Sequence, residues 1–349
     1  MKYYILDLRA ENSLVRYLLD EGYTVFIVSW KNPGSEDRNR SFEDYRKLGV
    51  EAALDVVRTI VPGQKVHGVG YCLGGTLLAA EAATLAREQK DILATVTLFA
   101  AQVDFKEAGE LTLFVNEGQV SFLEDMMWQQ GYLDARQMSG AFQLLRSNDL
   151  IWSRMVHDYL MGERQMQFDL MAWNADSTRM PYRMHSDYLR QLFLDNDLSE
   201  GRFRTDGKIA ALTDIRAPVF AVATETDHVA PWHSVFKLNL LLDTDVTFLL
   251  TTGGHNAGIV SPPSNGSRAY RVALRTEQDA YLDPETWYAR MPPHKGSWWP
   301  EWVSWLGEHS SGEIDAIPPG GNKYPPARPR PRHLRAADIA AARVLARSA

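Results

Sequence analysis

The stretch "GVGYCLGGT", Gly68 to Thr76, decides the fold because it places a candidate nucleophile between a predicted strand and a predicted helix. A side chain at such a strand-to-helix turn sits on a strained backbone, so small residues must flank it. Gly70 and Gly74 do so here, and Gly75 extends this relief. The usual pattern is G-x-S-x-G, whereas the central position here is Cys72, the only cysteine of the chain. The alternative is a buried structural cysteine beside an ordinary glycine turn.

The composition limits the classes of protein that the chain can represent. Its 349 residues are enough for one large domain or two ordinary ones, and the net charge of −7 gives no support to nucleic-acid binding. A single cysteine rules out an internal disulfide and favours a cytoplasmic location. The sequence contains no long apolar run and begins without a signal-peptide pattern, so no transmembrane segment is predicted.

Apolar, β-branched runs alternate with helical patterns, which predicts a mostly parallel sheet with helices on both faces. The predicted strands are Tyr23–Trp30, Lys65–Gly70, Ala94–Ala101, Ala217–Asp227 and Asp245–His255. The first predicted helices cover residues 12–22, 41–60 and 75–89, the last starting directly after the turn at Cys72.

The pattern divides the chain into four parts. Residues 1–102 form the first part of an α/β core, and residues 103–210, which have few strand-like runs and many aromatic residues and methionines, are predicted to form a helical cap inserted into it. Residues 211–309 form the second part of the core. Residues 310–349 are a tail rich in proline and arginine, which we expect to be extended, with a short helix at its end.

A thiol nucleophile needs a base, and the base needs an orienting group. Asp227 follows one late strand and His255 follows the next, so the chain order nucleophile, acid, histidine is that of the α/β-hydrolase fold. The backbone N–H of Leu73 is a candidate oxyanion donor at the start of the helix. Glu225 and Asp245 are less well placed rivals for the acid. No cluster has metal-ligand spacing, and no phosphate-binding loop is present.

Several further stretches, together with the elbow and in this order, resemble the catalytic domain of the polyhydroxyalkanoate synthases. The chain is most similar to the class I enzymes, which join short-chain (R)-3-hydroxyacyl-CoA units, with 3-hydroxybutyryl-CoA the expected monomer donor. The matching stretches are "KYYILDLRAENSLVRYLLDEGYTVFIVSWKNP", "GVGYCLGGT", "LRSNDLIWS", "FDLMAWNADSTRMP", "DHVAPWHSVFKL", "GGHNAGIVSPP" and "GSWWPEWVSWL", which span residues 2 to about 307.

The resemblance implies that the acyl chain grows as a thioester on Cys72, with CoA released and His255 as the base. Asp227 either orients His255 or helps to activate the 3-hydroxyl of the incoming unit, and the sequence leaves both roles open. The CoA thioester is a substrate, so no cofactor is expected. Arg146 in "LRSNDLIWS" matches a segment near the CoA entrance and suits the CoA phosphates, although a surface arginine or an ion pair within the cap is an equal alternative.

The resemblance also implies that an N-terminal domain and one core strand are missing, because the chain starts inside a family motif. The second oxyanion donor is expected near Ile5, and we expect impaired activity and homodimer formation. The family further implies contact with the growing polyester and a cytoplasmic location at polymer granules. The sequence also contains a cluster of tryptophans, Trp298, Trp299, Trp302 and Trp305. These side chains either contact the polymer or provide the packing of one amphipathic helix. Two alternatives remain, a thioesterase or depolymerase of the same fold, and a truncated non-catalytic copy that binds a partner or granule.

Overall fold

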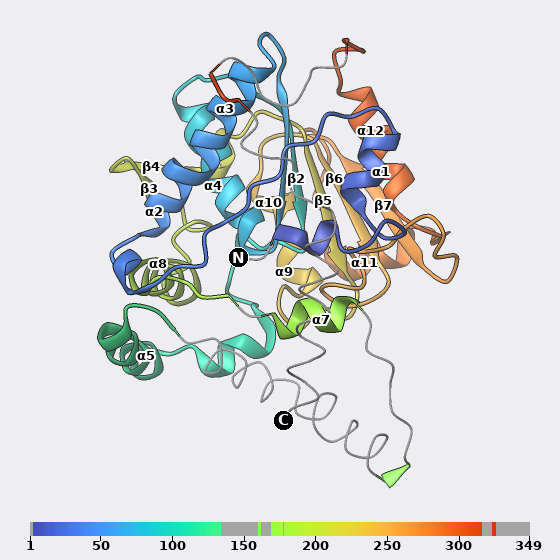
Figure 1. Cartoon of the computed structure of the whole chain (residues 1–349). Helices are drawn as coiled ribbons and strands as arrows, with labels where there is room; N and C mark the ends of the chain where they lie inside the picture. Colours follow the sequence, from blue (N-terminus) through green and yellow to red (C-terminus); the bar gives the residue numbers. More distant parts are fainter. Residues whose placement is uncertain (1–2, 134–159, 162–168, 177, 316–322, 326–349) are drawn as a thin grey trace.

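A six-stranded sheet in the order β1-β2-β5-β6-β7-β8 forms the centre of the molecule (Figure 1). The computed structural model describes residues 3–133, 160–161, 169–176, 178–315 and 323–325. Strands β1, β2, β5 and β6 are parallel, whereas β7 and β8 are antiparallel to their neighbours. The strands are β1 Val66–Tyr71, β2 Leu93–Phe99, β5 Val219–Thr224, β6 Val246–Thr251, β7 Ala269–Arg275 and β8 His294–Lys295.

Side chains alternate between the two faces of this sheet and join two separate cores. On β5, Val219, Ala221 and Ala223 belong to the larger core, together with α4 (Leu73–Arg87). Phe220 and Val222 point to the opposite face, where they pack with α1 (Leu14–Asp20) and α12 (Trp299–Glu308). Helices therefore cover both faces, as a parallel sheet requires.

Helices are present over the three segments that the patterns predict, with local differences. The predicted helix over 41–60 is split into α2 (Phe42–Tyr45), a π-helical turn η3 (Arg46–Glu51) and α3 (Ala52–Ile60). Ser13 caps α1 by accepting a hydrogen bond from the backbone N–H of Arg16. The other helical elements are η1 Tyr3–Leu6, η2 Ser35–Asp37, η4 Gly109–Phe114, η8 Leu212–Asp214, α9 Trp232–Phe236, α10 Leu238–Leu241 and α11 Pro284–Arg290.

The region predicted to form a cap is described in part. It contains α5 (Glu117–Gln130), α7 (Asp169–Ala175), α8 (Tyr182–Asp187) and the π-helical η7 (Tyr188–Leu194). A short hairpin of β3 (Arg204–Thr205) and β4 (Lys208–Ile209) follows. Most of the proline- and arginine-rich tail, including its predicted terminal helix, lies outside the described residues.

The cluster of tryptophans at the start of α12 packs inside the protein. Trp298, Trp299 and Trp302 are at most 1% exposed, and all three indole N–H groups donate hydrogen bonds within the molecule. Of the two alternatives left open by the sequence, packing of one amphipathic helix is therefore the correct one.

The prediction of a buried strand at Tyr23–Trp30 is wrong. The segment is extended but pairs with no strand, and Phe26, Ile27 and Val28 are 43%, 42% and 38% exposed. In the part of the chain that the structure describes, β1 is the terminal strand of the sheet, and its outer edge pairs with no strand. The sequence run has the composition of a strand, but backbone pairing needs a neighbour at hydrogen-bonding distance, and composition cannot supply one.

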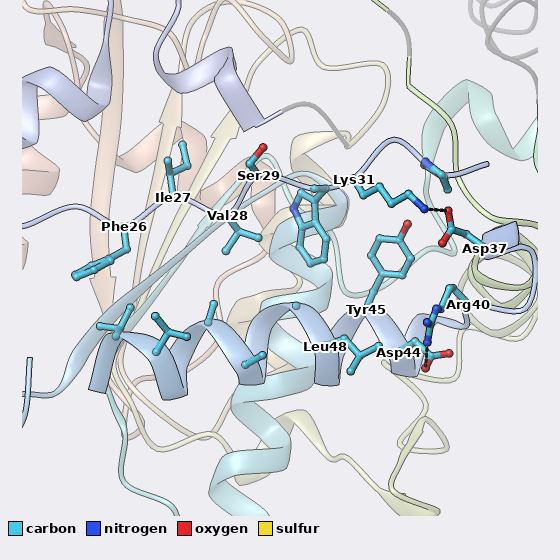
Figure 2. A pocket seen from close by; sticks show the side chains of 17 residues that line it. Phe26, Ile27, Val28, Ser29, Lys31, Asp37, Arg40, Asp44, Tyr45 and Leu48 are labelled. Atoms are coloured by element: carbon cyan, nitrogen blue, oxygen red, sulfur yellow. Dashed lines mark hydrogen bonds and ion pairs between the residues drawn. The ribbon is translucent and has the colours of Figure 1, made fainter. Parts of the chain in front are cut away.

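The unpaired segment instead lies over α2, η3 and α3 and encloses a groove of about 540 Å³. Phe26 and Val28 point toward the helices, whereas Ile27 and Ser29 point away from them (Figure 2). Trp30 stacks on Tyr45 with ring centroids 5.2 Å apart. The segment thus keeps the alternation of a strand while it packs on helices.

Candidate active site

Cys72 lies in the turn between β1 and α4 with a backbone that only a constrained turn produces. Its φ of 53° and ψ of −128° lie outside the regions that ordinary residues adopt. The Cys72 N–H donates a hydrogen bond of 2.8 Å to the carbonyl oxygen of Phe99 on β2, which anchors the turn to the sheet. The strand, strained turn and helix predicted from the sequence are therefore all present.

Two glycines make this turn possible, and they are not quite the predicted pair. A Cβ on Gly70 would lie 2.5 Å from the Cα of Gly75, and a Cβ on Gly75 would lie 2.4 Å from the Cβ of Ala101. A Cβ on Gly74 would meet nothing within 4 Å. The strand and helix therefore approach each other through Gly70 and Gly75, whereas Gly74 faces open space.

Asp227 and His255 meet at the carboxyl ends of β5 and β6. Nδ1 of His255 lies 2.7 Å from Oδ2 of Asp227, and the aspartate side chain is fully buried. The other donors to Asp227 are the hydroxyl of Thr224 at 3.1 Å and the backbone N–H groups of Val229 and Ala230 at 2.8 Å each. Both carboxylate oxygens are therefore occupied, and the carboxylate is held in one orientation.

The third member, Cys72, lies close enough to His255 for its charge to raise the pKa of the imidazole. Burial by itself lowers the pKa of His255, but the charges of Cys72 and Asp227 and the hydrogen bond to Asp227 raise it to about 10. The imidazole consequently holds its proton at neutral pH between the sulfur and the carboxylate. Sequence order alone predicted these three residues, and the fold brings them together.

The rival acids take no part in this arrangement. Glu225 accepts a hydrogen bond from Tyr288, and Asp245 accepts one from the backbone N–H of Glu277. His67 on β1 bonds to Thr95 and Ser310, as expected for a histidine with a structural role.

Two tyrosines that the sequence analysis did not select lie at the site. Tyr71 and Tyr188 are partly buried, and the pKa values of their phenols are raised by burial and then by the charge of Cys72. Tyr71 precedes the candidate nucleophile and was within the quoted motif. Tyr188 begins η7 far along the chain and packs against Phe105 and Phe193, so only the tertiary structure places it near the thiol.

Three predicted site residues remain, and the structure describes two of them. Leu73 is the first residue of α4, where backbone N–H groups have no acceptor within the helix. Ile5 is buried in η1, and its role as an oxyanion donor stays a prediction. Arg146 lies outside the described residues.

Two negative findings apply to the described residues alone. In them, no group of three histidine, cysteine, aspartate or glutamate side chains is arranged to hold a metal ion. Within the same part of the chain, no helix is both long and apolar enough to cross a membrane.

Comparison with known proteins assigns the class. Residues 6–262 match the alpha/beta hydrolase fold family, and the chain belongs to that family. Its mostly parallel sheet flanked by helices agrees with this assignment. Among solved structures, a monoacylglycerol lipase from Paleococcus ferrophilus is 18% identical with a TM-score of 0.44, covering 85% of this chain and 88% of that one.

Within this class, the chain is similar to curated polyester-forming enzymes. It is 41% identical over 92% of its length to the "Poly(3-hydroxyalkanoate) polymerase subunit PhaC" of Rhizobium etli, covering 50% of that protein. It is 40% identical over 95% of its length to the "Poly(3-hydroxyalkanoate) polymerase" of Methylorubrum extorquens, covering 54% of that protein. The chain thus spans about half the length of these relatives.

Proposed function

We propose that this chain is an acyltransferase that polymerises (R)-3-hydroxyacyl-CoA, with 3-hydroxybutyryl-CoA as the expected monomer donor, and that releases CoA. The observation that carries the proposal is the hydrogen bond between His255 and Asp227, with Cys72 close to the imidazole, in a chain 41% identical to a named polymerase. A thiol suits the reaction because moving an acyl group from the sulfur of CoA to that of Cys72 exchanges one thioester for another.

The pKa of His255, raised to about 10, keeps the imidazole protonated at neutral pH, and the proposed mechanism starts with the proton of the Cys72 thiol already transferred to this imidazole. In the first step the sulfur of Cys72 attacks the carbonyl carbon of the CoA thioester. The bond from that carbon to the CoA sulfur breaks, and the departing sulfur takes the proton from His255. Cys72 is then acylated, and His255 is neutral.

In the second step the 3-hydroxyl of another hydroxyacyl-CoA attacks the acyl-cysteine. Neutral His255 takes the hydroxyl proton, an ester bond forms, and the sulfur of Cys72 leaves as thiolate. The thiolate–imidazolium pair is thereby restored. The lengthened chain, now a CoA thioester, returns to Cys72 by a repeat of the first step.

Asp227 orients His255 in this proposal and does not act on the substrate hydroxyl. Each carboxylate oxygen of Asp227 accepts two hydrogen bonds from the described residues, and its side chain is fully buried, so an incoming hydroxyl has no free oxygen to reach. Its charge also stabilises the imidazolium through Nδ1, as in other nucleophile–histidine–acid sites.

Further groups complete the proposal. The backbone N–H groups of Leu73 and Ile5 stabilise the oxyanion, and Arg146 binds the CoA phosphates. The chain uses no cofactor beyond its CoA substrate. Its partners are the growing polyester at a cytoplasmic granule surface and a second copy of the chain in a homodimer.

The decisive experiment is incubation with (R)-3-hydroxybutyryl-CoA while CoA release and polymer are followed together. The proposal predicts both products from the native chain and neither from Cys72→Ala. Cys72→Ser is expected to retain little polymerisation, because an ester intermediate donates its acyl group less readily. CoA release with free hydroxy acid and no polymer would instead identify a thioesterase.

The role of Asp227 is separated by following the two steps individually. Asp227→Asn is expected to slow acylation of Cys72 and chain elongation by equal factors if the residue only orients His255. Normal acylation with slow elongation would assign Asp227 to the incoming hydroxyl instead. His255→Ala is expected to block acylation.

The open edge of β1 suggests a limit on the rate of residues 1–349 alone. Within the described residues, the strand that precedes Cys72 pairs with a strand on one side only, and Val69 in its middle is 39% exposed. Comparison with a fusion that adds the segment preceding the matched region in the Methylorubrum extorquens protein tests this limit. Faster initial CoA release and higher thermal stability of the fusion are expected. Equal values would show that residues 1–349 suffice.

A further inference from the structure

The strand that ends just before the nucleophile also holds the loop that carries the histidine. Tyr71 is the last residue of β1, and its ring centroid lies 5.2 Å from that of the His255 imidazole, with the planes inclined by 39°. Its hydroxyl donates to Oδ1 of Asn256 and lies 3.2 Å from the carbonyl oxygen of His255. Tyr71 therefore contacts this loop at a ring, at a backbone oxygen and at a side chain.

Asn256 extends this connection beyond the sheet. Its Nδ2 donates a hydrogen bond of 3.0 Å to Oδ1 of Asn174, a residue of α7. Helix α7 is itself tied to the start of the chain, because Arg9 and Asn12 both donate to Asp169. The series Tyr71, Asn256, Asn174 thus links β1, the histidine loop and α7.

The loop that carries His255 needs support from other elements because its own glycines allow several backbone conformations. Gly253 has a φ of +111°, a conformation that glycine adopts at low cost, and Gly254 follows it directly. The bond from Nδ1 of His255 to Asp227 fixes one ring atom, but a single hydrogen bond does not fix the ring plane. The ring of Tyr71 packs beside that plane, and its hydroxyl restrains the backbone on which the imidazole stands.

We propose that Tyr71 is a positioning residue that keeps the imidazole of His255 aligned between Asp227 and Cys72, and that Asn256 makes this alignment depend on the docking of α7 through Asn174. This inference rests on the proposed function, since it assigns the purpose of the tie to the pairing of Cys72 with His255. Docking of α7 and readiness of the nucleophile are therefore coupled.

The test uses the single thiol of the chain, which makes alkylation specific for Cys72. The rate of alkylation by iodoacetamide is measured from pH 5 to pH 10 in the full chain, without any acyl substrate. Tyr71→Phe keeps the ring and removes the hydroxyl, and we expect it to lower the rate about fivefold near pH 6.5, the scale of one lost hydrogen bond. At high pH the rate should approach that of the native chain, since there the thiolate forms without help from His255.

The outer half of the series is tested by a pair of substitutions. Asn174→Ala removes the acceptor for Asn256 and is expected to lower the rate about twofold at the same pH, because the effect is transmitted through one more hydrogen bond. Asn174→Asp keeps an acceptor oxygen and should restore the native rate. Tyr270→Phe removes the hydroxyl of a half-buried tyrosine bonded to Glu301 and is the matched control, expected to change nothing.

The outcomes separate this inference from the proposed function. If His255→Ala shifts the pH profile and Tyr71→Phe does not, the positioning role is wrong while the pairing of Cys72 with His255 stands. If His255→Ala also leaves the profile unchanged, both fail together. A loss in Tyr71→Phe that is equal at every pH overturns the positioning role as well. Should Tyr71→Phe not fold, Asn256→Ala, which removes the acceptor of the same hydroxyl, decides the question by the same profile.

Discussion

Strand β5 and the segment Tyr23–Trp30 have similar compositions and opposite fates. Every residue of β5 is buried, and the strand pairs with β2 on one side and β6 on the other. The segment Tyr23–Trp30 is even richer in β-branched and aromatic residues, yet it pairs with no strand, and three of its apolar side chains are about 40% exposed. The difference teaches that an apolar run becomes a strand only when neighbours supply both its hydrogen bonds and its cover.

The largest expected effect comes from removing an aromatic ring from β5, the buried strand in this comparison. Phe220 is fully buried on β5, and its ring lies 5.1 Å from that of Trp305. Phe220→Ala should lower the free energy of unfolding by about 3–5 kcal/mol, because the lost contacts leave a cavity that the surrounding sheet cannot close. Urea unfolding measures the change, and a value below about 1 kcal/mol would mean that this core is far less tightly packed than described.

The second effect is a dependence of stability on pH, and it arises on α8, near the segment Tyr23–Trp30. His185 on α8 is buried, and burial lowers its pKa to about 4. Because the charged form is disfavoured in the folded state, stability is full above the unfolded pKa of about 6.5 and falls as pH drops toward 4, by about 3 kcal/mol in total. The sign follows because the unfolded chain binds the proton more readily.

The variant His185→Gln isolates this contribution from that of the carboxylates. Its unfolding free energy should fall less steeply than that of the native chain between pH 6.5 and pH 4. Parallel curves for the two proteins would contradict the assignment. A less steep fall in the variant would mean that His185 is tightly enclosed on α8, which packs against α2 near the exposed segment Tyr23–Trp30. The exposure of that segment would then not extend to the helix beside α2.

The third effect tests the close contact between β1, the terminal strand of the sheet, and α4. Gly70→Ala would place a Cβ 2.5 Å from the backbone of Gly75, and we expect it to cost about 2–3 kcal/mol of unfolding free energy. Gly74→Ala is the matched control, since its Cβ meets nothing within 4 Å. Thermal unfolding of the two variants should differ clearly, and equal midpoints would show that β1 and α4 are not in close approach.

The smallest expected effect comes from the same substitution, phenylalanine to alanine, in the segment Tyr23–Trp30. Phe26 is 43% exposed in the unpaired segment. Phe26→Ala should change the free energy of unfolding by only about 0.5 kcal/mol, because much of the ring is already in contact with water. The measurement is again urea unfolding. A loss as large as that of Phe220→Ala would mean that the segment is a covered strand in solution.

Much of the site was predictable because it depends on short-range order along the chain. The turn at Cys72 shows itself through its glycines and the strand and helix beside it, and Asp227 and His255 each follow a recognisable strand. The sequence pattern does not predict Gly75 as the close-approach partner of Gly70. Tyr188 and Asn174 could not be found either, because they approach the site from segments whose placement no local pattern specifies.

The sequence by itself determined the class of fold, the candidate nucleophile and the order of its two candidate partners. These features rest on periodicity, on glycines at a turn and on a fixed succession of strands, all of which are local properties. The tertiary structure alone decided that Tyr23–Trp30 stays outside the sheet, that both oxygens of Asp227 are occupied, and that Tyr71 supports the histidine loop. The physical reason is that pairing, burial and hydrogen-bond satisfaction depend on neighbours distant in the chain, and a residue's own neighbours in sequence do not specify them.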